Sequence, residues 1–176
     1  MGTLIIHPKD TTTDFLSDIY KDKDWTILTE NISKSQLKLE IIHHDRIIML
    51  GHGSEDGLFD LKNFRFIISS ELVYLLRAKI CVGIWCNADK FFEKYKLNGF
   101  YTGMIISEVE EAYLYGIRES FDVIEQSNKL FAYAVKESID LTDIVDNIKQ
   151  IYVGDNEIIH FNKNNLFSQI RDNNNE

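Results

Sequence analysis

Residues 46–54 read RIIMLGHGS and residues 80–86 read ICVGIWC, and these two stretches decide the fold. Each begins with a continuous apolar run instead of an alternating one, which is typical of a strand covered by helices on both faces. Each then ends in small or reactive residues where such a strand would leave its sheet. We therefore expect two central strands of a parallel sheet, with their chemistry at the carboxyl ends.

Apolar runs alternate with stretches of helical period along the rest of the chain, which predicts an α/β fold: a doubly wound, mostly parallel sheet flanked by helices in three layers. The expected strands are residues 4–7, 25–28, 46–50, 80–85, 101–106 and 157–161, with a hairpin at 57–60 and 64–68. The expected helices are residues 12–20, 34–43, 70–76, 88–95, 108–115, 120–138 and 142–151. The strands that end at residues 7, 50 and 85 should lie parallel, with their carboxyl ends at one rim.

The composition fits one domain. A chain of 176 residues, 44% of them hydrophobic, can bury one continuous core, and its single Pro and nine Gly leave no candidate for a flexible linker. We expect one domain over residues 1–171 and a disordered tail over residues 172–176. The two cysteines do not suggest a disulfide framework, so each is interpreted as a buried small side chain or a reactive thiol.

The charge of the chain argues against two classes of partner. With 19 basic and 28 acidic residues, the formal net charge is −9, which repels phosphate backbones and anionic lipids. The first residues lack a basic leader, and their apolar run is too short for a signal peptide or a membrane span. We therefore expect a cytoplasmic protein that binds neither nucleic acid nor membrane, and its oligomeric state is left open.

His52 and Cys86 are the candidate chemical residues, because ligands of a doubly wound sheet bind beyond the carboxyl ends of its strands. Gly51 and Gly53 let the backbone around His52 turn sharply and approach a bound group closely. Cys86 precedes an expected helix, whose N-terminus favours thiolate over thiol. A thiolate, an imidazole and a backbone N–H, for which Gly53 is the candidate, are the minimum set for acyl transfer.

The two stretches resemble a known family. An apolar strand followed by His-Gly-Ser, and a second apolar strand that ends in Cys, are similar to the catalytic segments of the caspase, gingipain and legumain type of cysteine peptidase. The resemblance covers roughly residues 4–106 and implies a caspase-like fold, a catalytic dyad of His52 and Cys86, a peptide or protein substrate and no cofactor. The chain departs from the family at Trp85, where relatives usually have a small residue. Trp85 either narrows the site or marks decayed machinery, so an inactive caspase-like module that acts in protein interactions is the alternative.

The resemblance also implies where a substrate side chain would bind. Relatives form this pocket partly from the loop after the first strand and partly from the segment after the strand that follows the catalytic Cys. The residues of this chain that fall there are His7, Asp10, Glu108, Glu110 and Glu111. Carboxylates at these positions would pair with Arg or Lys by charge-assisted hydrogen bonds. The alternatives are a helix cap made by Asp10 or the threonines after it, and an ordinary acidic first turn of a helix.

Other kinds of site fit the sequence less well. Cys81 lies five residues before Cys86, so the two side chains point to opposite faces of a regular strand and Cys81 is expected in the core. The cysteines and histidines lack zinc-ligand spacing, so no metal site is expected. Residues 51–54 could also form a phosphate-binding loop for a nucleotide, but they lack the Lys of a P-loop and the glycine spacing of a dinucleotide-binding motif.

Overall fold

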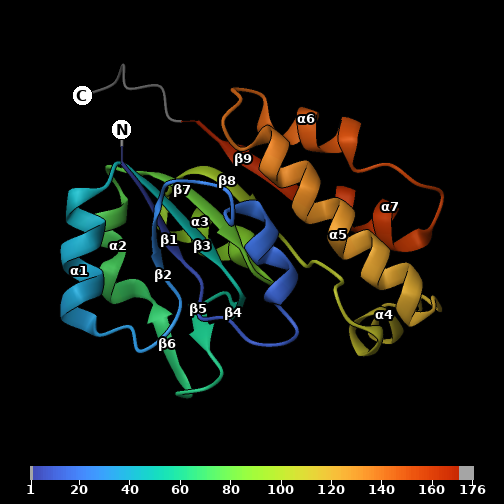
Figure 1. Ribbon diagram of the computed structural model, residues 1–176, viewed down its shortest axis with the longest axis horizontal. Helices are drawn as coiled ribbons and strands as arrows, with labels where there is room; N and C mark the ends of the chain where they lie inside the picture. The colour runs from blue at the N-terminus through green and yellow to red at the C-terminus, as the bar shows by residue number, and fades with distance from the viewer. Residues whose placement is uncertain (1, 171–176) are drawn as a thin grey trace.

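The computed structural model describes residues 2–170 and has a six-stranded sheet at its centre, with the order β2-β1-β3-β7-β8-β9 (Figure 1). Its strands are β1 (Thr3–Ile6), β2 (Thr26–Leu28), β3 (Arg46–Leu50), β7 (Ile80–Ile84), β8 (Asn98–Thr102) and β9 (Leu166–Gln169). The first five of these strands run parallel to one another, and β9 lies at one edge, antiparallel to β8. The predicted mostly parallel sheet is confirmed, and β1, β3 and β7 lie side by side with their carboxyl ends at one rim.

A second, antiparallel sheet leaves the large one directly after β3. It consists of β4 (His52–Ser54), β5 (Gly57–Asp60) and β6 (Arg65–Ile68), in that order. Gly51 forms the junction: its φ of 140° is one that L side chains rarely adopt, and its N–H bonds to the carbonyl of Ile84 at 3.1 Å. The predicted hairpin is confirmed, but His52 lies in a strand that pairs with it and not in a turn.

Helices cover both faces of the large sheet (Figure 1). One face carries α1 (Lys34–His43), α2 (Val73–Leu76) and α3 (Ala88–Tyr95); the other carries the 3-10 helix η1 (Asp14–Ile19), α5 (Phe121–Ser138), α6 (Ile144–Ile151) and α7 (Glu157–Lys163). A short 3-10 helix, η2 (Ser70–Leu72), precedes α2, and α4 (Val109–Leu114) precedes α5. Within β1, Leu4 and Ile6 enter one core while Ile5 enters the other. This two-sided burial explains the continuous apolar runs of the central strands.

Two predicted strands differ from the structure. Residues 157–161 belong to helix α7, because the side chain of Asn156 caps this segment by accepting a hydrogen bond from the N–H of Ile159 at 2.9 Å. The strand at the sheet edge is instead β9. The strand expected at residues 101–106 is β8, which begins at Asn98 and contains Gly99; a Cβ at position 99 would lie 1.8 Å from the carbonyl oxygen of Cys81.

The predicted tail, residues 172–176, lies outside the described residues. Among residues 2–170, no helix combines the length and the apolar character that crossing a membrane requires.

Candidate functional site

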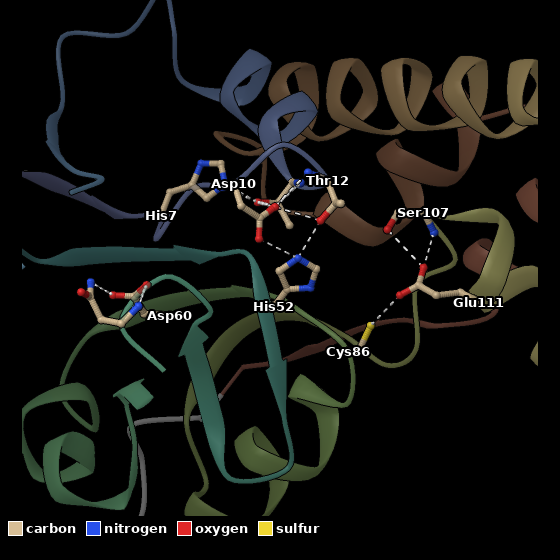
Figure 2. A network of polar contacts seen from close by, with 10 residues as sticks. His7, Asp10, Thr12, His52, Asp60, Cys86, Ser107 and Glu111 are labelled. Carbon is tan, nitrogen blue, oxygen red and sulfur yellow. Dashed lines mark hydrogen bonds and ion pairs between the residues drawn. The ribbon is translucent and has the colours of Figure 1, made fainter. Parts of the chain in front are cut away.

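His52 and Cys86 come from neighbouring parallel strands. β3 and β7 pair in register from Arg46 with Ile80 to Leu50 with Ile84. His52 follows β3 after one residue, and Cys86 follows β7 after one residue. Both side chains are half-buried at the rim formed by the carboxyl ends of the strands (Figure 2).

The imidazole of His52 is held by the loop that follows β1. Its Nε2 lies 3.0 Å from Oδ2 of Asp10 and 2.7 Å from Oγ1 of Thr12. The Thr12 hydroxyl donates its own hydrogen to Oδ1 of Asp10 at 2.8 Å, so its oxygen is left to accept. Because the Thr12 oxygen accepts, Nε2 carries the hydrogen, and in the neutral ring Nδ1 presents a lone pair. In Figure 2, this second ring nitrogen faces the side of the site on which Cys86 lies.

Asp10 is fixed as an anion. Its Oδ1 accepts hydrogen bonds from the backbone N–H groups of Thr12 and Thr13, at 2.9 and 3.0 Å. Burial acts to raise the pKa of Asp10, but the Thr12 hydroxyl, His52 and the two N–H groups outweigh burial and hold this pKa below its usual value. Asp10 therefore stabilises the turn in front of η1 and does not form the helix cap of the alternative interpretation, since no side chain caps η1. It also lies beside His52, which the sequence did not reveal.

His7, predicted as a pocket residue, is fully buried, so that prediction is wrong. Its Nδ1 lies 2.9 Å from the hydroxyl oxygen of Tyr20, and its Nε2 lies 3.3 Å from Oγ1 of Thr13. Burial, with a smaller contribution from Lys9, lowers the pKa of His7 to about 4, so the ring is neutral near neutral pH. His7 lies on the core side of the loop that carries Asp10 and supports this loop. Its buried ring does not reach a substrate.

Trp85 supports the strand that carries His52. The indole is 2% exposed and packs in the core against two phenylalanines of α3. Its N–H donates a hydrogen bond to the carbonyl of Ser54 at 2.9 Å, and a Cβ at position 53 would lie 2.2 Å from its Cδ1. Gly53 is thus required for close packing of β4 on the indole, whatever its N–H binds. The large side chain of Trp85 therefore lies in the core, packed beneath β4.

The thiol of Cys86 faces the segment that follows β8. Its Sγ lies 3.9 Å from Oε1 of Glu111 and 3.8 Å from the carbonyl oxygen of Ile105. The other oxygen of Glu111, Oε2, accepts hydrogen bonds from the N–H groups of Ser107 at 2.7 Å and Glu108 at 3.1 Å. Glu111 thus caps the start of α4, as in a capping box, and also contacts the sulfur (Figure 2).

Burial raises the pKa of Cys86 to about 12, and Glu111 and Glu108 act in the same direction. The thiol is therefore protonated near neutral pH. The thiolate predicted at the start of α3 is opposed by burial and by the two carboxylates.

A cavity of about 580 Å³ lies between η1, α4 and the first half of α5, with Thr12 and Glu108 in its lining, whereas Cys86 lines a separate cavity of about 30 Å³. The lining of the larger cavity includes the apolar side chains Phe15, Val109, Phe121 and Ile124 and the carboxylates Asp14, Asp18, Glu108, Glu110 and Glu125. Lys129 also lines it and pairs with Glu125 at 3.0 Å. Burial and then Glu111 raise the pKa of Glu108, while His52 acts in the opposite direction. Of the predicted pocket residues, Glu108 and Glu110 line this cavity, and Glu111 points to Cys86 instead.

Sequence reasoning missed Thr12 and the role of Trp85. The run of threonines after Asp10 indicates a capped turn, which is present, but this signal does not reveal the contact with His52. Cys81 is fully buried, as expected. Within residues 2–170, no three side chains of His, Cys, Asp or Glu are grouped so as to hold a metal ion.

Comparison with protein-family models, with curated proteins and with solved structures finds no match for this chain. The site is therefore interpreted from its own residues and geometry.

Proposed function

We propose that the chain is a cysteine endopeptidase of the caspase, gingipain and legumain type, with Cys86 as the nucleophile and His52 as the group that accepts and returns its proton. The observation that carries the proposal is the pairing of β3 with β7, which brings the two residues to one rim of a parallel sheet. The six-stranded sheet with helices on both faces is compatible with the caspase-like fold that the resemblance implies.

In the proposed reaction, Sγ of Cys86 attacks the carbonyl carbon of a peptide bond while the thiol proton passes to Nδ1 of His52. The carbonyl oxygen becomes an oxyanion, for which the N–H of Gly53 is the proposed donor. The C–N bond then breaks, His52 protonates the departing amine, and a thioester on Cys86 remains. Water attacks this thioester and forms the carboxylic acid, and its proton returns through His52 to the sulfur.

Asp10 and Thr12 have a positioning role in this reaction. They hold the hydrogen on Nε2, so the lone pair of Nδ1 is available for the proton of Cys86. Once Nδ1 is protonated, the imidazolium has the Asp10 carboxylate as its counter-ion.

The cavity supports a substrate with Arg or Lys before the cut bond. Apolar walls suit the aliphatic stem of these side chains, and carboxylates suit their charged ends. Of the five carboxylates, Asp14, Asp18 and Glu125 already pair with lysines, whereas Glu108 and Glu110 form no ion pair among the described residues. Glu108 and Glu110 are therefore the proposed partners of the substrate cation.

An inactive interaction module of the same fold is the second candidate. It is favoured by the protonated thiol of Cys86 and its contact with Glu111, because a nucleophile must lose this proton in order to react. Such a module would bind a peptide in the same cavity without cutting it.

A fluorogenic peptide library and a peptidyl acyloxymethyl ketone, which alkylates catalytic cysteines, distinguish the two candidates. The endopeptidase should cut after Arg or Lys and be labelled at Cys86, and both activities should be lost in Cys86→Ala and in His52→Ala. Peptide binding in calorimetry without cleavage or labelling would favour the interaction module. Cleavage that survives Cys86→Ala eliminates the catalytic proposal. A preference for acidic or apolar residues before the cut bond eliminates only the proposed pocket for Arg or Lys.

A further inference from the structure

The contact between Cys86 and Glu111 is not needed by the proposed reaction. A nucleophilic thiol needs a base that takes its proton, and His52 supplies one. A carboxylate near the sulfur does the opposite, because its negative charge disfavours the thiolate. Oε1 of Glu111 nevertheless lies 3.9 Å from Sγ, where it can accept the S–H hydrogen, as can the carbonyl oxygen of Ile105 at 3.8 Å.

The position of the Glu111 carboxylate is built into the fold. Its Oε2 is held by Ser107 through the N–H at 2.7 Å and the hydroxyl at 3.2 Å, in addition to the N–H of Glu108. The carbonyl of Ser107 accepts a hydrogen bond from Asn128 of α5 at 2.9 Å. One residue earlier, Ile106 exchanges two backbone hydrogen bonds with the side chain of Asn162, at 2.8 and 3.0 Å. The segment in front of α4 is therefore anchored to α5 and α7, and it presents a fixed carboxylate to the sulfur.

We propose that Glu111 is a latch on Cys86: its fixed carboxylate beside the sulfur keeps the thiol protonated and turned toward α4, and it is displaced when a substrate occupies the site. A role of the latch in regulating peptide cleavage rests on the proposed peptidase function. The effect of Glu111 on the protonation of the Cys86 thiol does not depend on that function. Glu111 and Glu108 are the charged groups that act on the sulfur, both from the start of α4, and His52 on β4 is its proposed proton acceptor.

Glutamine at position 111 separates the latch from the helix cap. Its side-chain oxygen can still accept hydrogen bonds from the backbone at the start of α4, since Gln replaces Glu in capping boxes, but it carries no charge. Glu125→Gln is the matched control. It removes the same charge from the lining of the cavity, at a residue that pairs with Lys129 and makes no described contact with Cys86.

The measurement is the rate at which iodoacetamide alkylates Cys86 between pH 6 and pH 10, followed by mass spectrometry of the peptide that contains it. In Glu111→Gln, the rate at pH 8 should rise at least about 10-fold, the equivalent of one pKa unit, and the midpoint of the pH profile should fall. In Glu125→Gln, the rate should stay within about 2-fold of the wild-type rate, because charge in the cavity acts from further away. Cys81, fully buried, serves as an internal reference that should remain unmodified.

Two outcomes overturn the latch. An unchanged rate in Glu111→Gln shows that the carboxylate does not hold the thiol, and an equal acceleration in Glu125→Gln shows that only the charge of the cavity matters. If Glu111→Gln does not fold, as judged by circular dichroism, Glu111→Asp decides, because its shorter side chain withdraws the carboxylate from the sulfur: faster alkylation of Cys86 supports the latch, and an unchanged rate overturns it. Peptide cleavage is measured separately, so a chain that cuts no peptide refutes the proposed function without refuting the latch.

Discussion

The two halves of the candidate site favour opposite charge states. In the histidine half (Asp10, Thr12 and His52), an anionic carboxylate lies 3.0 Å from Nε2, where it would stabilise an imidazolium. In the cysteine half (Cys86, Ser107 and Glu111), a carboxylate lies beside the sulfur and opposes a thiolate. Proton transfer from Cys86 to His52 is therefore favoured by one half and opposed by the other. Under the proposed function, the proton acceptor is held in position by its neighbours, while the proposed nucleophile is kept in its protonated, unreactive form.

The two cysteines sharpen this comparison. Burial raises the pKa of Cys81 to about 12 and the pKa of Cys86 to about 12, but Glu111 contributes only at Cys86. Cys81 lies within β7 in the core, so its thiol stays protonated as long as the fold persists. At Cys86, part of the shift depends on one carboxylate, which a substitution or a ligand can remove.

The largest expected effect is the loss of the dyad. Cys86→Ala should lower kcat/KM at least about 1,000-fold, His52→Ala nearly as much, and the double variant little more, because the two groups act in one step. Cys81→Ala should leave turnover intact and lower the free energy of unfolding by about 1 kcal/mol through loss of packing. Kinetics with the best fluorogenic peptide and urea unfolding measure these effects. Fully additive losses of activity in the double variant would contradict a shared step.

The next effect tests the charge of the histidine half. Asp10→Asn should lower kcat roughly 10- to 100-fold with little change in KM, because an amide cannot stabilise the imidazolium as a carboxylate does. Asp14→Asn is the control, since Asp14 pairs with Lys9 at 2.7 Å at the start of η1 and does not contact His52. An increase in KM with unchanged kcat would show that Asp10 binds substrate, as the sequence predicted.

The third effect concerns the core beneath the histidine half. The pKa of His7 is about 4 in the fold against an ordinary value of 6.5, so the unfolded chain takes up a proton first as the pH falls. The free energy of unfolding should therefore decrease between about pH 6.5 and pH 4, by about 3 kcal/mol, and should not change for this reason above that window. Urea unfolding at pH 7, 5.5 and 4 measures the decrease.

The matched variants for this third prediction are His7→Gln, which should lose most of the decrease, and His43→Gln, an exposed histidine at the end of α1, which should keep it. If the free energy of unfolding decreased equally with falling pH in His7→Gln, other groups would be the cause of the pH dependence. The histidine half would then not depend on a neutral His7 in the core.

The smallest effect tests whether the histidine half needs the support of β4. Trp85→Phe removes the hydrogen bond from the indole to the carbonyl of Ser54 and should lower the free energy of unfolding by about 1 kcal/mol, with a several-fold lower kcat. Trp25→Phe, directly before the edge strand β2, should leave kcat unchanged. Equal kcat in both variants would mean that Asp10 and Thr12 position His52 without help from Trp85.

The hydrophobic periodicity of the sequence correctly predicted the strands and helices that are regular and buried. The bounds of β3, α1 and α3 agree with the predicted residues 46–50, 34–43 and 88–95. It failed at residues 157–161, because a short apolar pair such as Ile158 and Ile159 fits a strand or a helix equally well. The cap made by Asn156 decided for the helix.

The sequence by itself determined the two central strands, the order of His52 and Cys86 along the chain, and the glycine that lets the backbone turn after β3. These features are local, since burial on both faces and backbone freedom are encoded by neighbouring residues. Only the tertiary structure decided which carboxylate faces which group. Thr12 and His52 are 40 positions apart, and Cys86 and Glu111 are 25 positions apart. Such contacts depend on how loops pack over the rim of the sheet, and an apolar pattern reports burial but not the partner that a polar side chain meets.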